Sequence, residues 1–93
     1  MTMITMRIQL ELPKENVEEL RALMKEADIE TYKQLFKDAL SLLYWSVKEA
    51  KKGRIIASVD DQSGKYREVV MPTLQTVAAR AAAARREEEA AVR

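Results

Sequence analysis

The sequence predicts a mainly helical (α+β) fold that one copy of the chain does not complete. Residues 7–12 alternate polar and apolar side chains, which is typical of a half-buried strand. Two amphipathic helices are predicted directly after this strand, at residues 14–27 and 31–52. No second strand lies close to the first in sequence. We therefore expect the strand to find its partner in a second copy, forming an intersubunit antiparallel ribbon.

The predicted strand has two chemically different faces, because successive side chains of a strand point to opposite sides. Its apolar residues share one face: Ile8, Leu10 and Leu12. Its polar residues share the other face: Arg7, Gln9 and Glu11. Pro13 lacks a backbone N–H and restricts the residue before it, so the strand is expected to end there.

The two helices are predicted from apolar residues at helical spacing and from signals at their ends. In the first helix the apolar positions are Val17, Leu20, Leu23, Met24 and Ala27. Residues 28–30 read as a short connection, and Thr31 is a suitable N-cap for the second helix. Gly53 is a typical residue just beyond a helix C-terminus. The stretch 7–53 is thus predicted to form one strand-helix-helix domain.

The second helix carries a wide apolar surface. Its main stripe consists of Leu35, Phe36, Ala39, Leu40, Leu43, Val47 and Ala50. Leu42 and Trp45 widen this stripe, and a helix this apolar needs neighbours on more than one side. The lone strand could pair with the later hairpin of the same chain or with a second copy. The extra width of the helix favours a homodimer, with a predicted core of Ile8, Leu10, Leu12, Leu35, Phe36, Ala39, Leu40 and Leu43.

The C-terminal part is predicted to be a β-hairpin over 54–72 and an alanine-rich tail over 73–93. Residues 54–59 and 65–71 are rich in β-branched side chains and flank a cluster of turn-forming residues at 60–64. Asp60 and Asp61 could bind a cation, but they lack the graded ligands of a calcium loop, which favours a simple turn. Alanine has the highest helix propensity, so we expect the tail to be helical or partly disordered.

Composition excludes several classes of function. The 93 residues include no cysteine and no histidine, which removes thiolate sites, the commonest metal ligand and the commonest general base. We expect no metal, no cofactor and no enzymatic activity, because no nucleophile–base pair or phosphate-binding glycine loop is present. No apolar run is long enough to span a membrane, and no secretory signal is visible. These observations favour a cytoplasmic protein.

The first residues do not enter the fold prediction. The sequence Met-Thr-Met-Ile-Thr at positions 1–5 resembles the β-galactosidase leader used in cloning vectors. If it has that origin, Met6 is the natural start, and residues 1–6 are set apart from the predicted domain as a leader segment.

The order strand, helix, short turn, helix within about 45 residues resembles the ribbon-helix-helix family of Arc-type repressors. Residues 31–43 resemble the second helix of that family, with a hydroxyl residue first, then two apolar residues, then an Ala-Leu-x-Leu pattern at positions 39–42. Some small bacterial members continue, as here, into a glycine and a hairpin with an acidic tip. The resemblance covers about residues 7–71.

The resemblance implies a homodimeric transcriptional regulator, such as a repressor, that places its ribbon in the major groove of double-stranded DNA. The residues that read bases are then expected to be Arg7, Gln9 and Glu11, which suit guanine, adenine and cytosine respectively. Thr31, Tyr32 and Lys33 are expected to hold a phosphate at the start of the second helix.

The charge pattern departs from that expectation and keeps a second function open. Residues 1–30 hold four basic and seven acidic side chains, including Glu11 and Glu30. Residues 31–53 hold five lysines against two acids, and the net charge of the chain is +1. The alternative is a ribbon-helix-helix-like dimerisation or adaptor module that binds a protein through the hairpin and residues 73–93. Antitoxins, whose tails fold on a toxin, combine both functions.

Overall fold

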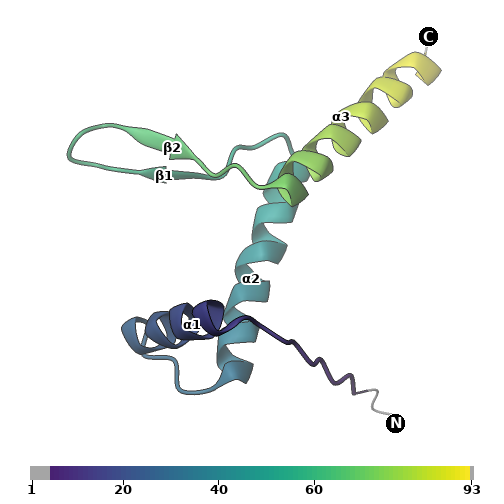
Figure 1. The fold of residues 1–93 in the computed structure, drawn as a ribbon. Helices are drawn as coiled ribbons and strands as arrows, with labels where there is room; N and C mark the ends of the chain where they lie inside the picture. The colour runs from purple at the N-terminus through teal and green to yellow at the C-terminus, as the bar shows by residue number, and fades with distance from the viewer. Residues whose placement is uncertain (1–4, 93) are drawn as a thin grey trace. The chain divides into compact units, whose positions relative to one another are not determined.

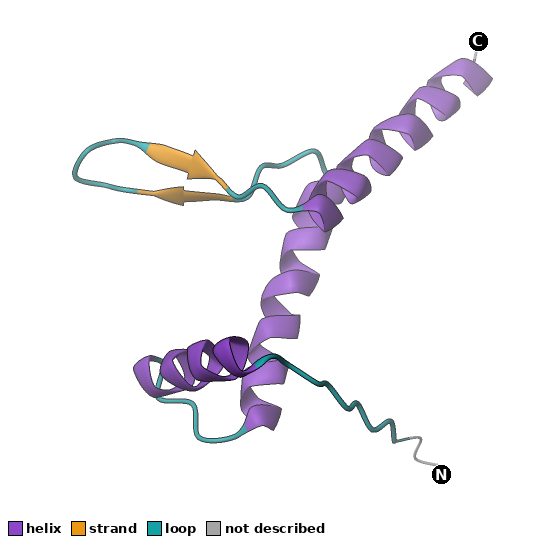
Figure 2. Cartoon of the chain, in the orientation of Figure 1, coloured by secondary structure: helices purple, strands orange, loops and turns teal. Residues whose placement is uncertain are grey.

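The computed structural model describes residues 5–92 and contains helices and a small sheet, which confirms a mixed α+β chain (Figures 1 and 2). The elements are α1 (Lys14–Glu26), α2 (Tyr32–Lys51), β1 (Ala57–Val59), β2 (Tyr66–Glu68) and α3 (Pro72–Val92). The first four residues of the predicted leader lie outside the described residues, as does Arg93 of the tail.

The chain divides into two units, which we describe separately. The first unit, Met1–Phe36, contains the N-terminal segment, α1 and the start of α2. The second unit, Lys37–Arg93, contains the rest of α2, the hairpin and α3. Their boundary lies inside α2.

Helix α1 ends in a Schellman motif, in which the two residues beyond the cap donate back to the last turn. The N–H of Asp28 donates to the carbonyl of Lys25 at 3.3 Å, and the N–H of Ile29 donates to that of Met24 at 2.8 Å. Asp28 occupies the left-handed position with a φ of 56°. Aspartate tolerates this conformation better than most residues because its short polar side chain can bond locally.

Helix α2 begins and ends where the sequence predicts. Thr31 Oγ1 accepts the N–H of Gln34 at 3.1 Å, so Thr31 is a genuine N-cap. At the other end Gly53 has a φ of 79° and donates to the carbonyl of Ala50, while Arg54 donates to that of Glu49. This is a second Schellman motif, here with the glycine that such a motif favours.

The predicted hairpin is present, although its regular strands are shorter than the predicted segments 54–59 and 65–71. The register pairs Ala57 with Glu68, Ser58 with Arg67 and Val59 with Tyr66. Two backbone bonds extend this ladder, from Val69 N–H to the carbonyl of Ile56 and from Asp60 N–H to that of Lys65. The strands end early because the backbone at both feet of the hairpin turns towards a helix, α2 on one side and α3 on the other.

The aspartates at the hairpin tip build a turn, as the sequence favours. Asp60 Oδ1 accepts the N–H of Gln62 at 3.1 Å, and Asp60 Oδ2 accepts the hydroxyl of Ser63 at 2.9 Å. The hydrogen bond from Ser63, followed by those from the backbone, holds the pKa of Asp60 below its ordinary value of 3.8. Gly64, with a φ of 71°, completes the turn by donating to the carbonyl of Asp60.

The alanine-rich tail is a helix through Val92, so of the two expected states the helical one is found across the described part of 73–93. Pro72 does more than close the hairpin, because it is the first helical residue, a position that needs no N–H donor. Arg85 of α3 then donates to the carbonyl of Lys51 at 3.0 Å, across 34 residues of sequence. This bond satisfies a carbonyl that the end of α2 leaves without an intrahelical partner.

Very little of the described chain is buried. The buried apolar side chains are Met24 in the first unit and Ala50 and Leu74 in the second, and no large side chain is fully buried. Ser46 is also buried, with its hydroxyl bonded to the carbonyl of Leu42 at 2.8 Å. Each unit therefore leaves most of its apolar residues in contact with solvent.

The left-handed backbone at Gly53 predicts the effect of adding a side chain there. We expect Gly53→Ala to lower the free energy of unfolding by about 1 kcal/mol, because a Cβ is disfavoured at positive φ. A methyl group at this site lies 3.6 Å from Arg85 Nη1, which is an ordinary contact, so the cost comes from the backbone. Urea denaturation at fixed protein concentration measures it. Lys52→Ala is the control, and an equal loss in both variants contradicts this explanation.

The hydrogen bonds of Asp60 predict a titration. We expect Ser63→Ala to raise the pKa of Asp60 towards 3.8, because it removes the largest cause of the shift. Since the folded pKa is the lower one, the turn's stabilisation is present above the unfolded pKa and is lost as pH falls through the folded pKa. Carbon-detected NMR of the Asp60 carboxyl measures this. Ser58→Ala, in the same hairpin, should leave the pKa of Asp60 unchanged.

Candidate nucleic-acid interface

In one copy of the chain the predicted strand at 7–12 has no strand partner. Residues 5–13 carry no regular secondary structure, and they run as an extended stretch into α1 (Figure 1). Strand assignment requires a paired neighbour, so the predicted intersubunit ribbon stays a prediction. Pro13 ends this stretch and begins α1, because its carbonyl accepts the first helical hydrogen bond, from Val17 N–H at 3.1 Å.

The apolar residues of the extended stretch are exposed. Ile8 is 56% exposed, Leu10 is 71% exposed and Leu12 is 44% exposed. Exposing three aliphatic side chains at alternate positions is unfavourable, because each gains roughly 1.5–3 kcal/mol when it is removed from water. These residues therefore form an apolar surface that is exposed to solvent in one copy of the chain.

The polar residues of the same stretch are free to bind. Arg7, Gln9 and Glu11 are exposed, and none of them has a hydrogen bond or ion pair within residues 5–92. The guanidinium, the amide and the carboxylate thus keep all of their donors and acceptors available. They differ in what they can bind: Arg7 only donates, Gln9 donates and accepts, and Glu11 only accepts.

The start of α2 offers a second set of donors. The backbone N–H groups of Tyr32 and Lys33 lie in the first helical turn, where no intrahelical acceptor exists. Thr31 uses its hydroxyl as the cap, and the side chains of all three residues are exposed. Such a helix start binds anions, because its N–H groups and its dipole both favour negative charge. The acid just before it, Glu30, is also exposed.

The structure does not join these two sets into one site. No hydrogen bond or ion pair links Arg7, Gln9 or Glu11 to Thr31, Tyr32 or Lys33 in the described part of the chain. Of the predicted dimer core on α2, Leu35, Leu40 and Leu43 are half-buried, whereas Phe36 and Ala39 are exposed. Leu42 and Trp45, which widen the apolar stripe, are also exposed.

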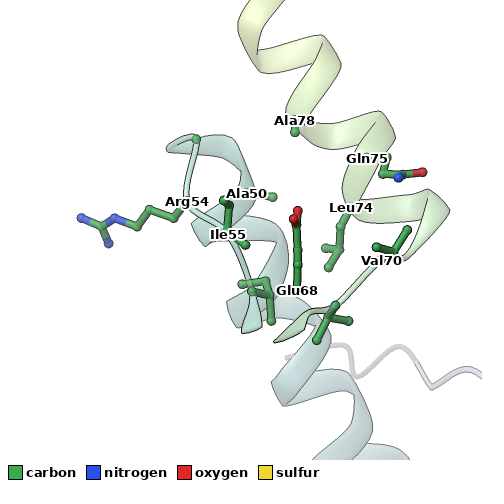
Figure 3. A pocket seen from close by; sticks show the side chains of 11 residues that line it. Ala50, Arg54, Ile55, Glu68, Val70, Leu74, Gln75 and Ala78 are labelled. Atoms are coloured by element: carbon green, nitrogen blue, oxygen red, sulfur yellow. The ribbon is translucent and has the colours of Figure 1, made fainter. Parts of the chain in front are cut away.

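A hollow in the second unit was not predicted from the sequence. It has a volume of about 160 Å³ and lies at the foot of the hairpin, between the end of α2 and the start of α3 (Figure 3). Ala50, Ile55, Val70 and Leu74 supply much of its apolar wall, and the side chain of Glu68 rises among them. The signal that could have revealed it is the alternation Tyr66, Glu68, Val70, which puts a carboxylate on an apolar strand face.

Residues 5–92 contain no group of three or more acidic side chains arranged to hold a metal ion. No helix in the same range is long and apolar enough to cross a membrane. Comparison with known proteins gave no match to any family model, curated protein or solved structure.

Proposed function

We propose that the chain is a homodimeric DNA-binding protein, a transcriptional regulator of the ribbon-helix-helix kind. The observation that carries the proposal is the exposed alternation at residues 7–12. Three aliphatic side chains lie uncovered between three polar side chains that bind nothing within the described part of the chain. Pairing of this stretch with its copy about a two-fold axis buries the first set and leaves the second set facing outward.

The size of the first unit supports dimerisation. Met1–Phe36 comprises 36 residues, and within its described part, residues 5–36, one apolar side chain is buried, that of Met24. Units below about 40 residues rarely fold without disulfides, metals or a partner chain. Cysteine and histidine are absent from the sequence, which removes disulfides and thiolate or imidazole metal sites. A second copy supplies the partner chain in the proposed dimer. The uncovered Leu42 and Trp45 of α2 give the second unit a similar need for a neighbour.

The chemistry of the polar face supports DNA as the ligand. A two-stranded ribbon fits the major groove, where Arg7 matches the two acceptors of guanine and Gln9 matches the donor and acceptor of adenine. Glu11 accepts from the amino group of cytosine. These three residue types together match the edges of three different bases, which suits sequence-specific rather than general binding.

Phosphate contacts complete the proposed interface. The free N–H groups of Tyr32 and Lys33, with the Lys33 ammonium, hold a backbone phosphate at the start of α2. The capping hydroxyl of Thr31 fixes these N–H groups in place, since it closes the first turn of the helix. Glu30 and Glu11 weaken the attraction of DNA from a distance, so close contacts supply most of the affinity.

The proposal predicts a dependence on Arg7 and Gln9. Duplexes selected from a randomised 20-base-pair pool are titrated with the protein in fluorescence anisotropy at low salt. We expect Arg7→Ala to weaken binding by about 1–3 kcal/mol and to relax sequence preference, because it removes a bidentate base contact. Lys33→Ala should weaken binding to all duplexes alike, because it removes a phosphate contact that does not depend on sequence. It should also reduce the slope of the logarithm of the binding constant against the logarithm of the salt concentration by about one.

The control is Arg21→Ala, which removes the same charge from an exposed position on α1 outside the proposed interface. Undetectable binding by the wild-type chain, or binding that survives the double variant Arg7→Ala plus Gln9→Ala, rules out reading by the ribbon.

The proposal also predicts how assembly responds to charge on each face of the ribbon. We expect Leu10→Asp to abolish the folded dimer, because it buries an unpaired carboxylate between the two copies. Gln9→Asp adds the same charge to the outward face and should leave the dimer intact while reducing DNA binding. Sedimentation velocity and far-ultraviolet circular dichroism measure both effects. A wild-type chain that is a stable, folded monomer at micromolar concentration contradicts the dimer.

A further inference from the structure

The hairpin carries an apolar face that stays largely exposed within residues 5–92. In the observed register Ala57, Val59, Tyr66 and Glu68 share one face, and the alternation extends it to Ile55 and Val70 at the hairpin's foot. The large apolar members of this face, Ile55, Val59, Tyr66 and Val70, are between 61% and 71% exposed. The opposite face carries the polar pair Ser58 and Arg67 at its centre, so the two faces differ in character.

An uncovered two-stranded hairpin is marginally stable in water, and such a sheet normally packs against something. The foot of the hairpin gains cover from α3, where Leu74 is buried. Val59 and Tyr66, farther out along the same face, have no such cover. The apolar surface therefore runs from the hollow at the foot to the outer end of the strands.

The hollow at the foot of this face is the size of a side chain. Its volume of about 160 Å³ lies well below the roughly 300–1,000 Å³ of pockets that hold drug-sized ligands. Aliphatic carbon from Ile55, Val70 and Leu74 lines it, and the Glu68 carboxylate stands within it (Figure 3). A long side chain with an apolar stem and a cationic end fits such a site, because its stem contacts the aliphatic wall while its charged end reaches the carboxylate within the hollow.

The carboxylate of Glu68 has no cation of its own. Glu68 forms no hydrogen bond or ion pair within residues 5–92. The basic residue among those that line the hollow is Arg54, whose side chain extends away from it (Figure 3) and pairs with Glu49 at 2.8 Å. No residue of the apolar face is basic, so a ligand that covers the face and buries Glu68 has to bring the positive charge.

We propose that the hairpin's apolar face and the hollow bind a cationic, apolar segment of a partner protein. A lysine or arginine of that segment enters the hollow and pairs with Glu68. An apolar side chain two residues further along an extended segment then lies over Val59 and Tyr66. The reason is that side chains two residues apart on an extended chain point to the same side and have the same spacing as Glu68 and Tyr66.

Charge distinguishes this partner from the other surfaces that could cover the face. A second copy of the same hairpin face brings another glutamate and no cation, so it buries carboxylates without partners, which is costly. An anionic membrane surface offers no cation to the Glu68 carboxylate, so it also leaves that carboxylate unpaired. A cationic polypeptide removes both difficulties.

This surface goes beyond the proposed DNA reading and uses different residues. The proposed DNA contacts lie within residues 7–33, whereas the face and the hollow are built from residues 50–78. A failure of either proposal can therefore be distinguished from a failure of the other by measuring both ligands on the same variants.

The test uses the full chain and three labelled, end-capped peptides of twelve residues. In the first, every second residue is serine and the others alternate between lysine and leucine. The second has glutamate for lysine, and the third has serine for leucine. We expect the first peptide to bind in fluorescence anisotropy, with NMR shifts at Tyr66, Glu68 and Leu74, and the other two to bind at least tenfold more weakly. The net charge of +1 gives no general attraction to a cationic peptide.

The variant Glu68→Gln keeps the shape of the side chain and removes its charge. It should lower the affinity for the first peptide about tenfold or more, since a charge-assisted hydrogen bond of roughly 1.5–3 kcal/mol is lost. Glu68→Lys should reverse the preference in favour of the glutamate peptide. Tyr66→Ser should weaken binding without altering the charge. The matched control is Glu88→Gln, which makes the same change at an exposed position of α3.

Three outcomes overturn the proposal. The first is equal binding of the lysine and glutamate peptides. The second is an equal loss of binding in Glu68→Gln and Glu88→Gln. The third is self-association beyond a dimer that Tyr66→Ser abolishes in sedimentation equilibrium, because it identifies a second copy as the cover. DNA binding by Glu68→Gln should equal that of the wild-type chain.

Discussion

The chain carries more apolar side chains than one copy can bury, and this imbalance governs the rest of the structure. Met24, Ala50 and Leu74 are the buried apolar residues of the described part, whereas Leu10, Leu42, Trp45 and Tyr66 remain in water. The hydrophobic effect dominates folding and is roughly proportional to the apolar area removed from water. Local hydrogen bonds shape each helix, but they leave these surfaces exposed in one copy of the chain. In the proposed dimer, stability and recognition are therefore coupled.

Local interactions explain how much of the fold could be predicted from the sequence. The ends of α2 follow from Thr31 and Gly53, and the hairpin tip follows from Asp60 and Gly64, because caps and turns depend on a few neighbouring residues. Asp28 in the left-handed position was not foreseen, since aspartate adopts it only sometimes. The bond from Arg85 to the Lys51 carbonyl was also not foreseen, because spacing along a sequence does not reveal a contact across 34 residues.

The difference between local and long-range contacts also decides which parts of the candidate sites could be predicted. The alternation at residues 7–12 is a local signal that separates an apolar set from a polar set, and both sets are exposed in one copy of the chain. The partner proposed for that stretch is a second copy, so neither the sequence nor one copy of the structure supplies it. The hollow beside Glu68 depends on α3 returning to the foot of the hairpin, and no short-range pattern encodes that approach. Only the alternation at 66–70 was available in the sequence.

The weak charge of the chain bears on how a DNA reader of this kind would work. Nonspecific DNA binding comes almost entirely from phosphate neutralisation by basic residues, and residues 1–30 hold more acids than bases. The proposed interface thus gains little from general attraction, and base contacts carry a larger share of its affinity. Because those contacts sit on a ribbon that exists only in the dimer, DNA occupancy should follow the concentration of dimer steeply. The partner proposed to bind at Glu68 uses none of the residues proposed to contact DNA, so the protein can bind both ligands at once.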